Sequence, residues 1–369
     1  MNQRIRVLLL FGGRSAEHDV SRVTAVAVAR ALDPQRYEVL PVGITTEGRW
    51  LLADAARRAI AAGPAALPPA FEVGGELVGE LGELATGRPL TVGSGLGEVD
   101  VVFPLLHGPY GEDGTVQGLL ELADLPYVGA GVVGSAVGMD KVMMKRAFVA
   151  AGLPIAAYLA HRDGHDVNAF ADRVERELGL PCFVKPANMG SSVGVAKAHD
   201  RVELDAAIAA ALVFDEWILA EEMVVGREIE VAVLGDDPPE TSVPGEIVPG
   251  AEFYDYDDKY EDGAAELLIP APLAPERVDE VRDLAGRAFE SCRLEAMARV
   301  DCFYTETRGF LVNEVNTIPG FTPISMYPRL WEASGVSYPE LLDRLVELAI
   351  ARHARRTARA GRQRDGRQR

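Results

Sequence analysis

Residues 298–316 read ARVDCFYTETRGFLVNEVN, and this stretch decides how the rest of the sequence is interpreted. Two runs rich in valine and aromatic residues flank a short Thr-Arg-Gly segment, which predicts two antiparallel strands joined by a tight turn. Side chains alternate between the two faces of a strand, so Arg299 and Asp301 share one face, and Glu314 and Asn316 share one face. If the hairpin closes, two carboxylates and an amide converge.

Asp301, Glu314 and Asn316 would present hard oxygen ligands, which suit magnesium together with water and phosphate oxygens. The alternative is an arginine–carboxylate pair across a solvated sheet face. The valine-rich flanks predict burial, and a buried unpaired acid is costly. The sequence therefore favours a bound cation at this hairpin.

The chain leaves the second strand through a loop, 316–325, that contains two prolines and a glycine before a helix opens. The backbone N–H of Gly320 and the hydroxyl of Ser325, near a helix N-terminus, suit a carboxylate or an oxyanion. Ser325 could also be a simple helix cap. The two roles are compatible.

Two earlier segments suit a nucleotide. Residues 183–194 predict a strand that ends at Lys185 and a loop of small residues, in which backbone N–H groups can approach phosphates beside a lysine charge. The alternative is a glycine-rich hairpin turn. Residues 216–233 predict two strands with acids at their connection, which could hold adenine and ribose, although edge strands also carry solvated glutamates.

Composition sets the limits. With 369 residues, 48% of them apolar and 25% charged, the chain is long enough for two or three globular domains. A net charge of -19 disfavours nucleic acid as a partner. No apolar run reaches the roughly 18 residues that span a bilayer, so we expect no membrane partner. The apolar run near the N-terminus is short and ends at a Gly-Gly turn, which indicates a strand and not a signal peptide, so we expect a cytoplasmic location. The cysteines lack pair spacing and should be reduced core thiols; they are Cys182, Cys292 and Cys302.

The pattern along the chain predicts an α/β protein whose N-terminal part is a βαβ unit. The expected elements are a strand over 5–10, a helix over 17–32, a strand over 37–44, a variable surface excursion over 53–98, a parallel central strand over 99–106 and a helix over 140–151. The expected domains are 1–125, 126–235 and 236–350, followed by a disordered tail, 351–369, with eight arginines and one aspartate.

Taken together, these segments resemble the ATP-grasp superfamily and, within it, the D-alanine:D-alanine ligase family, over roughly residues 6 to 350. One such motif alone is weak evidence for the family, but six motifs in the same order are specific for it. They are Gly12 to Ser21, His107 to Gly114, Met139 to Lys141, Lys185 to Gly194, Tyr254 to Tyr260, and Arg299 to Ser325.

The resemblance implies an N-terminal open parallel α/β substrate domain followed by a two-part ATP-grasp module, and it assigns roles to residues. It places ATP and two Mg²⁺ (or Mn²⁺) ions in one active site, with Asp301, Glu314 and Asn316 as the metal ligands. The implied ATP contacts are Lys141, Lys185 and Lys259 at the phosphates, Glu221, Val224 and Glu228 at adenine and ribose, and Ser192 and Glu222.

The same resemblance implies which residues contact the substrates. Glu17 would hold the ammonium of the first D-alanine, with His107 beside that substrate. Ser325 would bind the carboxylate of the second D-alanine, with Met326 adjacent. Arg299 and the Gly320 N–H would stabilise the oxyanion, and Glu17, Ser191 and Tyr260 would form a hydrogen-bonded triad that closes a loop near 250–262.

The implied activity is ATP-dependent ligation of two D-alanines through an acyl phosphate, for peptidoglycan precursor synthesis, by a homodimer. The alternatives are a D-alanine:D-lactate ligase, another ATP-grasp carboxylate–amine ligase, or a nucleotide-binding protein without turnover. Tyr260 after Lys259 favours the dipeptide enzyme over the D-lactate one. A dehydrogenase is set aside because the first turn lacks the G-x-G-x-x-G spacing.

Overall fold

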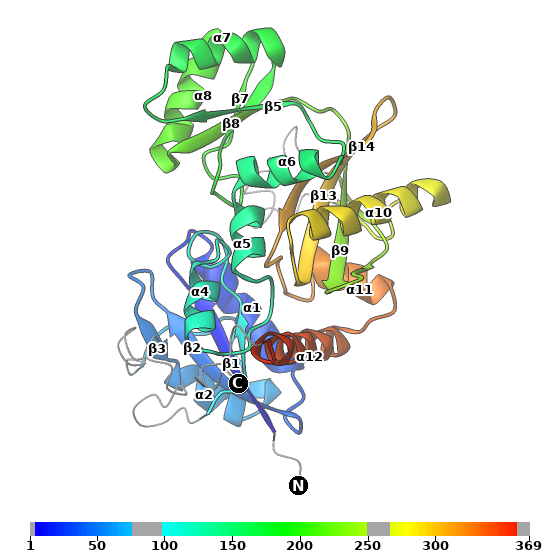
Figure 1. Cartoon of the computed structure of the whole chain (residues 1–369). Helices are drawn as coiled ribbons and strands as arrows, with labels where there is room; N and C mark the ends of the chain where they lie inside the picture. The colour runs from blue at the N-terminus through cyan, green and yellow to red at the C-terminus, as the bar shows by residue number, and fades with distance from the viewer. Residues whose placement is uncertain (1–3, 76–97, 249–265, 360–369) are drawn as a thin grey trace, which may run out of the picture.

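The computed structural model describes residues 4–75, 98–248 and 266–359. Three sheets are present: the N-terminal sheet at the base of Figure 1, an antiparallel sheet in the middle of the molecule, and a small sheet in the upper lobe. Helix α6 (Lys141–Ala150) lies between the upper lobe and the middle sheet. Helix α12 (Tyr338–Thr357) lies between the middle sheet and the N-terminal layer.

The N-terminal layer confirms the βαβ unit. Its strands run in the order β3-β2-β1-β4, with β1 parallel to both neighbours, β2 and β4. The elements are β1 Ile5–Gly12, α1 His18–Ala31, β2 Tyr37–Ile44, β3 Trp50–Leu52 and β4 Val101–Pro104. A central parallel strand is covered on both faces, which is why β1 reads as an unbroken apolar run from Val7 to Phe11.

The segment predicted as a surface excursion, 53–98, is partly core, and that prediction was wrong for its first half. It forms helix α2 (Asp54–Ala61) and the short helix η1 (Pro64–Ala66). Phe71 is fully buried against Phe11, with ring centroids 5.5 Å apart. Alanine-rich sequence with few large side chains gives weak periodicity, so one buried aromatic was not recognised as an anchor. Residues 76–97 lie outside the described residues.

The upper lobe is a four-stranded sheet in the order β5-β8-β6-β7. Its strands are β5 Tyr158–Arg162, β6 Cys182–Pro186, β7 Ala196–Ala198 and β8 Trp217–Glu222. Helices α7 (Val167–Glu177) and α8 (Arg201–Phe214) pack against one face. Helix α6 packs against the other face, where its Val142 contacts Leu219 of β8. Two short helices precede α6 in the chain: α4 (Thr115–Leu122) and α5 (Val132–Met139).

The middle sheet runs in the order β12-β11-β9-β13-β14, with β10 paired to β9. Its elements are β9 Arg227–Gly235, β10 Glu240–Thr241, β11 Gly245–Val248, β12 Glu266–Leu268, α10 Pro275–Ser291, β13 Ala296–Thr305 and β14 Gly309–Asn316. Alternate residues of β9 face opposite ways: Val231 packs with α10, whereas Leu234 packs with α11 (Met326–Ala333) and α12. The expected domain boundary at 235 is therefore one strand late, because β8 and β9 already belong to different sheets.

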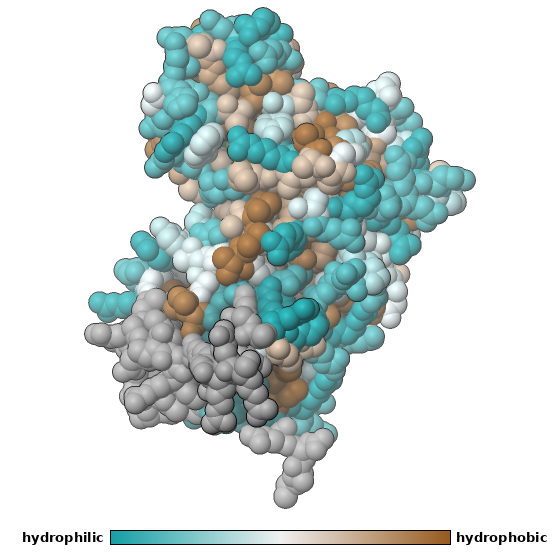
Figure 2. Space-filling view, viewed as in Figure 1, coloured by the Kyte–Doolittle hydropathy of each residue, from teal (hydrophilic) through white to brown (hydrophobic). Residues whose placement is uncertain are grey.

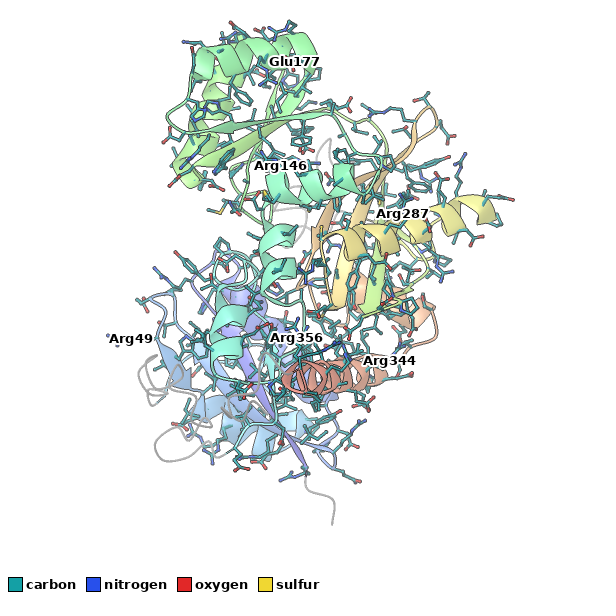
Figure 3. All side chains as sticks on the ribbon, viewed as in Figure 1. Arg49, Arg146, Glu177, Arg287, Arg344 and Arg356 are labelled. Atoms are coloured by element: carbon teal, nitrogen blue, oxygen red, sulfur yellow. The ribbon has the colours of Figure 1, made fainter. Side chains whose placement is uncertain are left out.

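The tail expected to be disordered from 351 is helical through Thr357, and that prediction was wrong for its first part. Arg352 is buried, and its guanidinium donates 2.6 Å to the carbonyl of Tyr127. Arg356, labelled in Figure 3, pairs with Glu121 and Glu295. These arginines bind carbonyls and acids of distant segments, which local charge patterning does not reveal.

Two further observations concern the cysteines and the character of the helices. All three cysteines are buried and free. Within the described ranges, no helix combines the length and the apolar character needed to cross a bilayer.

Candidate active site

The predicted hairpin is present, and it aligns four polar side chains that we call the hairpin edge: Arg299, Asp301, Glu314 and Asn316. In the register of β13 and β14, Asp301 lies opposite Glu314, and Arg299 lies opposite Asn316. The register shifts directly after Asp301. Strand pairing alone therefore brings these side chains together on one face.

Arg299 neutralises much of the acid at the hairpin edge. Its guanidinium binds both carboxylate oxygens of Asp301, at 2.7 and 2.6 Å, and approaches Glu230 on β9 at 3.2 Å. Burial acts to lower the pKa of Arg299, but Asp301 and Glu230 outweigh it and raise that pKa well above its ordinary value. The arginine–carboxylate pairing is thus present both within β13, with Asp301, and across to β9, with Glu230.

The hairpin edge also fits a hard metal ion. The Oδ1 atom of Asn316 is buried without a hydrogen-bond partner among the described residues, and such an acceptor is costly unless a ligand satisfies it. Asp301 and Glu314 add carboxylates beside it. In the described part of the chain no three His, Cys, Asp or Glu side chains surround one point, so phosphate oxygens and water would complete the coordination, as Mg²⁺ prefers.

Facing the hairpin edge is a second set of charges, which we call the lysine cluster: Lys141 and Lys145 of α6, Lys185 of β6 and Glu221 of β8. One carboxylate joins two of the lysines, because Glu221 lies 2.5 Å from Lys145 through Oε1 and 2.5 Å from Lys185 through Oε2. Lys141 donates 2.7 Å to the carbonyl of Met189 and lies 3.8 Å from Glu314 of the hairpin edge. The two sets of charges therefore meet.

The charges of the lysine cluster depend on one another. Burial alone would raise the pKa of Glu221, but Lys145 and Lys185 outweigh it and lower the pKa to about 2. Burial acts against the charge of Lys185, and Glu221 reverses this effect and raises its pKa. Burial lowers the pKa of Lys141. Glu221 is therefore an ionised acid held between two cations.

The remaining residues expected at the nucleotide come from the loop after β6, from β8 and β9, and from the connection between these two strands. Glu222 accepts from Arg308 of the β13–β14 turn at 2.8 Å and from the Ala157 N–H at 2.7 Å. Val224 lies in the connection between β8 and β9, and Glu228 lies on β9 opposite Phe303. Ser192 follows Ser191 in the loop after β6, with φ angles of 59° and 49°. Lys259 lies outside the described residues.

The first half of the expected triad is formed. Ser191 donates a 2.5 Å hydrogen bond to Glu17, which joins the loop after β6 to the start of α1. Gly190 and Gly108 both approach the same carboxylate, since a Cβ at either would lie 3.4 or 3.3 Å from Glu17 Oε2. Tyr260, the third member, lies outside the described residues.

His107 and Glu112, from the loop after β4, bind both backbone groups of one residue in the loop after β14, Ile318. His107 Nδ1 lies 3.0 Å from the carbonyl of Ile318, and Glu112 accepts from the Ile318 N–H at 3.1 Å and from Gly108 at 2.7 Å. Burial lowers the pKa of His107, so the ring is neutral with Nδ1 protonated. Burial, aided by Glu17, raises the pKa of Glu112 to about 8.

Gly320 and Ser325 lie together, as expected. A Cβ on Gly320 would sit 3.0 Å from Ser325 Oγ. Ser325 occupies the N-cap position of α11, but its hydroxyl does not cap the helix and instead lies 2.8 Å from the hydroxyl of Thr322. Met326 departs from the expectation: its side chain is buried against Gly245, so it can face the loop only through its backbone.

Three residues of this site carried no assigned role in the sequence: Lys145, Glu112 and Glu230. Lys145 is one helical turn after Lys141, Glu112 lies inside the polar loop after β4, and Glu230 is two positions after Glu228. The helical or strand period, or the shared loop, therefore related each of them to a residue with an expected role. Their partners lie far along the chain on other elements, and only the fold reveals them.

Comparisons with known proteins point to one family over nearly the whole chain. Family models described as the D-ala D-ala ligase N-terminus and C-terminus match residues 6–130 and 147–347. The chain is 49% identical over 365 residues to the D-alanine–D-alanine ligase of Geobacillus kaustophilus, covering 95% of this chain and 96% of that protein. It is 50% identical over 365 residues to that of Mycolicibacterium paratuberculosis, covering 95% and 98%.

Solved structures give the same result. The D-alanine–D-alanine ligase of Coxiella burnetii matches with a TM-score of 0.81 and 34% identity, over 96% of each chain. The VanG D-Ala:D-Ser ligase of Enterococcus faecalis matches with a TM-score of 0.82 and 33% identity, over 94% of this chain and all (100%) of that one. The chain belongs to the D-ala D-ala ligase family.

Proposed function

We propose that this protein joins two D-alanine molecules into D-alanyl-D-alanine, with cleavage of ATP to ADP and phosphate, for peptidoglycan precursor synthesis. One observation carries this proposal: the hairpin edge and the lysine cluster face each other, 3.8 Å apart between Lys141 and Glu314. The loop that holds Gly320 and Ser325 follows β14 directly. A site for phosphoryl transfer therefore adjoins a site for a carboxylate.

The chain's own residues would divide the work. Lys141 and Lys185 would hold the phosphates, with Ser192 on the same loop and Glu221, Glu222, Val224 and Glu228 along the nucleoside. Asp301, Glu314 and Asn316 would hold two magnesium or manganese ions, which when bound neutralise charge on the phosphoryl oxygens. Lys259 would add a further phosphate contact.

The first D-alanine would be held by its ammonium at Glu17, which Ser191 orients, with neutral His107 beside it. Its carboxylate oxygen attacks the γ-phosphorus, which forms an acyl phosphate and releases ADP. The amine of the second D-alanine, held by its carboxylate at Ser325, then attacks the acyl carbon. Arg299 and the Gly320 N–H would stabilise the oxyanion, and loss of phosphate leaves the peptide bond.

Water must be kept away while the acyl phosphate exists. Glu17 and Ser191 come from the N-terminal layer and the upper lobe, so their bond draws these parts together over the site. Figure 2 shows the outline indented between the upper lobe and the base, where such closure would act. Tyr260 would complete this closure.

The test is phosphate release by the purified chain with magnesium and ATP. Release that requires D-alanine, with D-alanyl-D-alanine as product, supports the proposal, and absence of both rejects it. D-alanine, D-serine and D-lactate offered together as second substrates would identify the preferred acceptor. A preference for D-serine or D-lactate would replace the dipeptide assignment. The homodimer and the cytoplasmic location stay predictions, and sedimentation tests the first.

A further inference from the structure

Lys145 differs from the other lysines of the lysine cluster in how deeply it lies. Its side chain is 1% exposed, whereas those of Lys141 and Lys185 are 14% and 17% exposed. The two more exposed lysines are within reach of a triphosphate. Lys145 is buried against Glu221, so its role must differ from direct phosphate binding.

The contacts of Lys145 fix its ammonium in one place. Nζ lies 2.5 Å from Glu221 Oε1, 3.4 Å from the carbonyl of Asn313 on β14, and 5.9 Å from the centre of the Tyr158 ring. These partners belong to β8, β14 and β5, so one cation ties the upper lobe to the middle sheet. A buried ammonium is tolerated only where such acceptors surround it.

Glu221 has two cationic partners, and they serve different purposes. Tyr158 lies opposite Glu221 across β5 and β8, and Lys185 lies diagonally across β6 and β8. When a triphosphate binds Lys185, that lysine divides its charge between phosphate and Glu221. Without Lys145, the buried Glu221 would then lack a counter-ion, and would compete with the phosphate for Lys185.

We propose that Lys145 is a positioning residue for nucleotide binding: it is the permanent counter-ion of Glu221, and so leaves Lys185 available to the triphosphate. This inference rests on the proposed nucleotide site at Lys185. Lys145 touches no substrate itself. Its effect passes through Glu221 and Lys185.

The test compares Lys145→Met with Lys145→Arg, using the full-length protein. Loss of the counter-ion is expected to raise the KM for ATP about 30-fold, which is typical of breaking a buried charge-assisted hydrogen bond. The KM for D-alanine should stay within about twofold, since that part of the site is untouched. Lys145→Arg should restore the KM for ATP to within about threefold of wild type, because it restores the charge.

Arg146→Met is the matched control, one position further along α6 (Figure 3), where the side chain is exposed and the guanidinium donates to the Met143 sulfur at 3.5 Å. It should leave both KM values unchanged. If Lys145→Met also lowers kcat and raises both KM values equally, Lys145 is merely structural and the proposal is overturned.

A double variant isolates the path through Glu221. Glu221→Gln removes the acid that Lys145 serves, so Lys145→Met added to it should change the KM for ATP by less than about twofold. A full multiplicative effect would mean that Lys145 contacts the nucleotide directly, which overturns the proposal. If Lys145→Met alone does not fold, the comparison of Glu221→Gln with the double variant, together with Lys145→Arg, still tests the proposal. Wild-type protein without D-alanine-dependent phosphate release would instead reject the proposed function.

Discussion

The hairpin edge and the lysine cluster are both sets of partly or fully buried charges around one site, but they are assembled differently. The hairpin edge uses two strands joined by a short turn, and its four residues lie within 299–316. The lysine cluster draws on α6, β6 and β8, so its residues span 141–221. Local pairing fixes the first, and packing of a helix against a sheet fixes the second. Substitutions should therefore separate chemistry at the hairpin edge from nucleotide binding at the lysine cluster.

The largest expected effect comes from Asp301→Asn. It removes a charge proposed to hold the metal ions and also weakens the hold on Arg299, whose guanidinium binds both oxygens of Asp301. We expect kcat to fall about 10²- to 10³-fold, with a higher magnesium requirement. Asp283→Asn, on the exposed side of α10, is the control for steady-state assays across a magnesium titration. Activity within about threefold of wild type would remove Asp301 from the site.

A second prediction concerns the grip that Glu112 has on Ile318, which holds the loop directly after the hairpin edge. The folded pKa of Glu112 is raised from 4.5 to about 8, so folding favours its protonated form. The unfolded chain releases this proton near pH 4.5, and the stability that Glu112 contributes is therefore present below that pH and lost as pH rises toward 8.

Denaturant unfolding from pH 5 to pH 8 measures this loss. Relative to Glu112→Gln, which does not titrate, wild type should lose about 3 to 4 kcal/mol over this range. His107, whose pKa burial lowers, acts in the opposite direction in both proteins and cancels in the comparison. A difference that is constant with pH would show that Glu112 is ionised in the folded protein.

Lys185→Met should affect a different kinetic constant from Asp301→Asn. Removing this ammonium, 2.5 Å from Glu221, is expected to raise the KM for ATP about 10- to 30-fold, because a charge-assisted contact to phosphate is lost. Arg162→Met on β5 of the same sheet is the control, since its side chain is half exposed. If Lys185→Met lowered kcat as much as Asp301→Asn and left the KM for ATP unchanged, the contrast between the two sets of charges would fail.

The smallest effect should come from the ion pair that links the two regions. Arg308, in the turn of the hairpin, binds Glu222 at the end of β8 at 2.8 Å, and its side chain is 43% exposed. Exposed pairs contribute about 0 to 1 kcal/mol, so Arg308→Ala should change the KM for ATP by less than about fivefold. The change should shrink further in high salt. A tenfold effect would identify Arg308 as part of the nucleotide site.

The same contrast explains what the sequence could predict. Alternation along two short strands was enough to predict that Asp301, Glu314 and Asn316 converge, and the βαβ unit followed from apolar runs and turn residues. Lys145 and Glu112 were missed because a charged side chain on a helix or loop usually faces solvent, and their partners are more than 70 residues away in Glu221 and 200 away in Ile318. The arginines of α12 were misjudged for the same reason.

Helix α12 also has a consequence for how the protein is made. Leu341 and Leu345 share one hydrophobic core with Val7 and Leu9 of β1, and Asp343 binds Arg36 and Tyr37 at the start of β2. Strands β1 and β2 are therefore synthesised long before α12, the helix that closes their core. The N-terminal layer is completed only after synthesis has passed residue 345, and its apolar face needs protection until then.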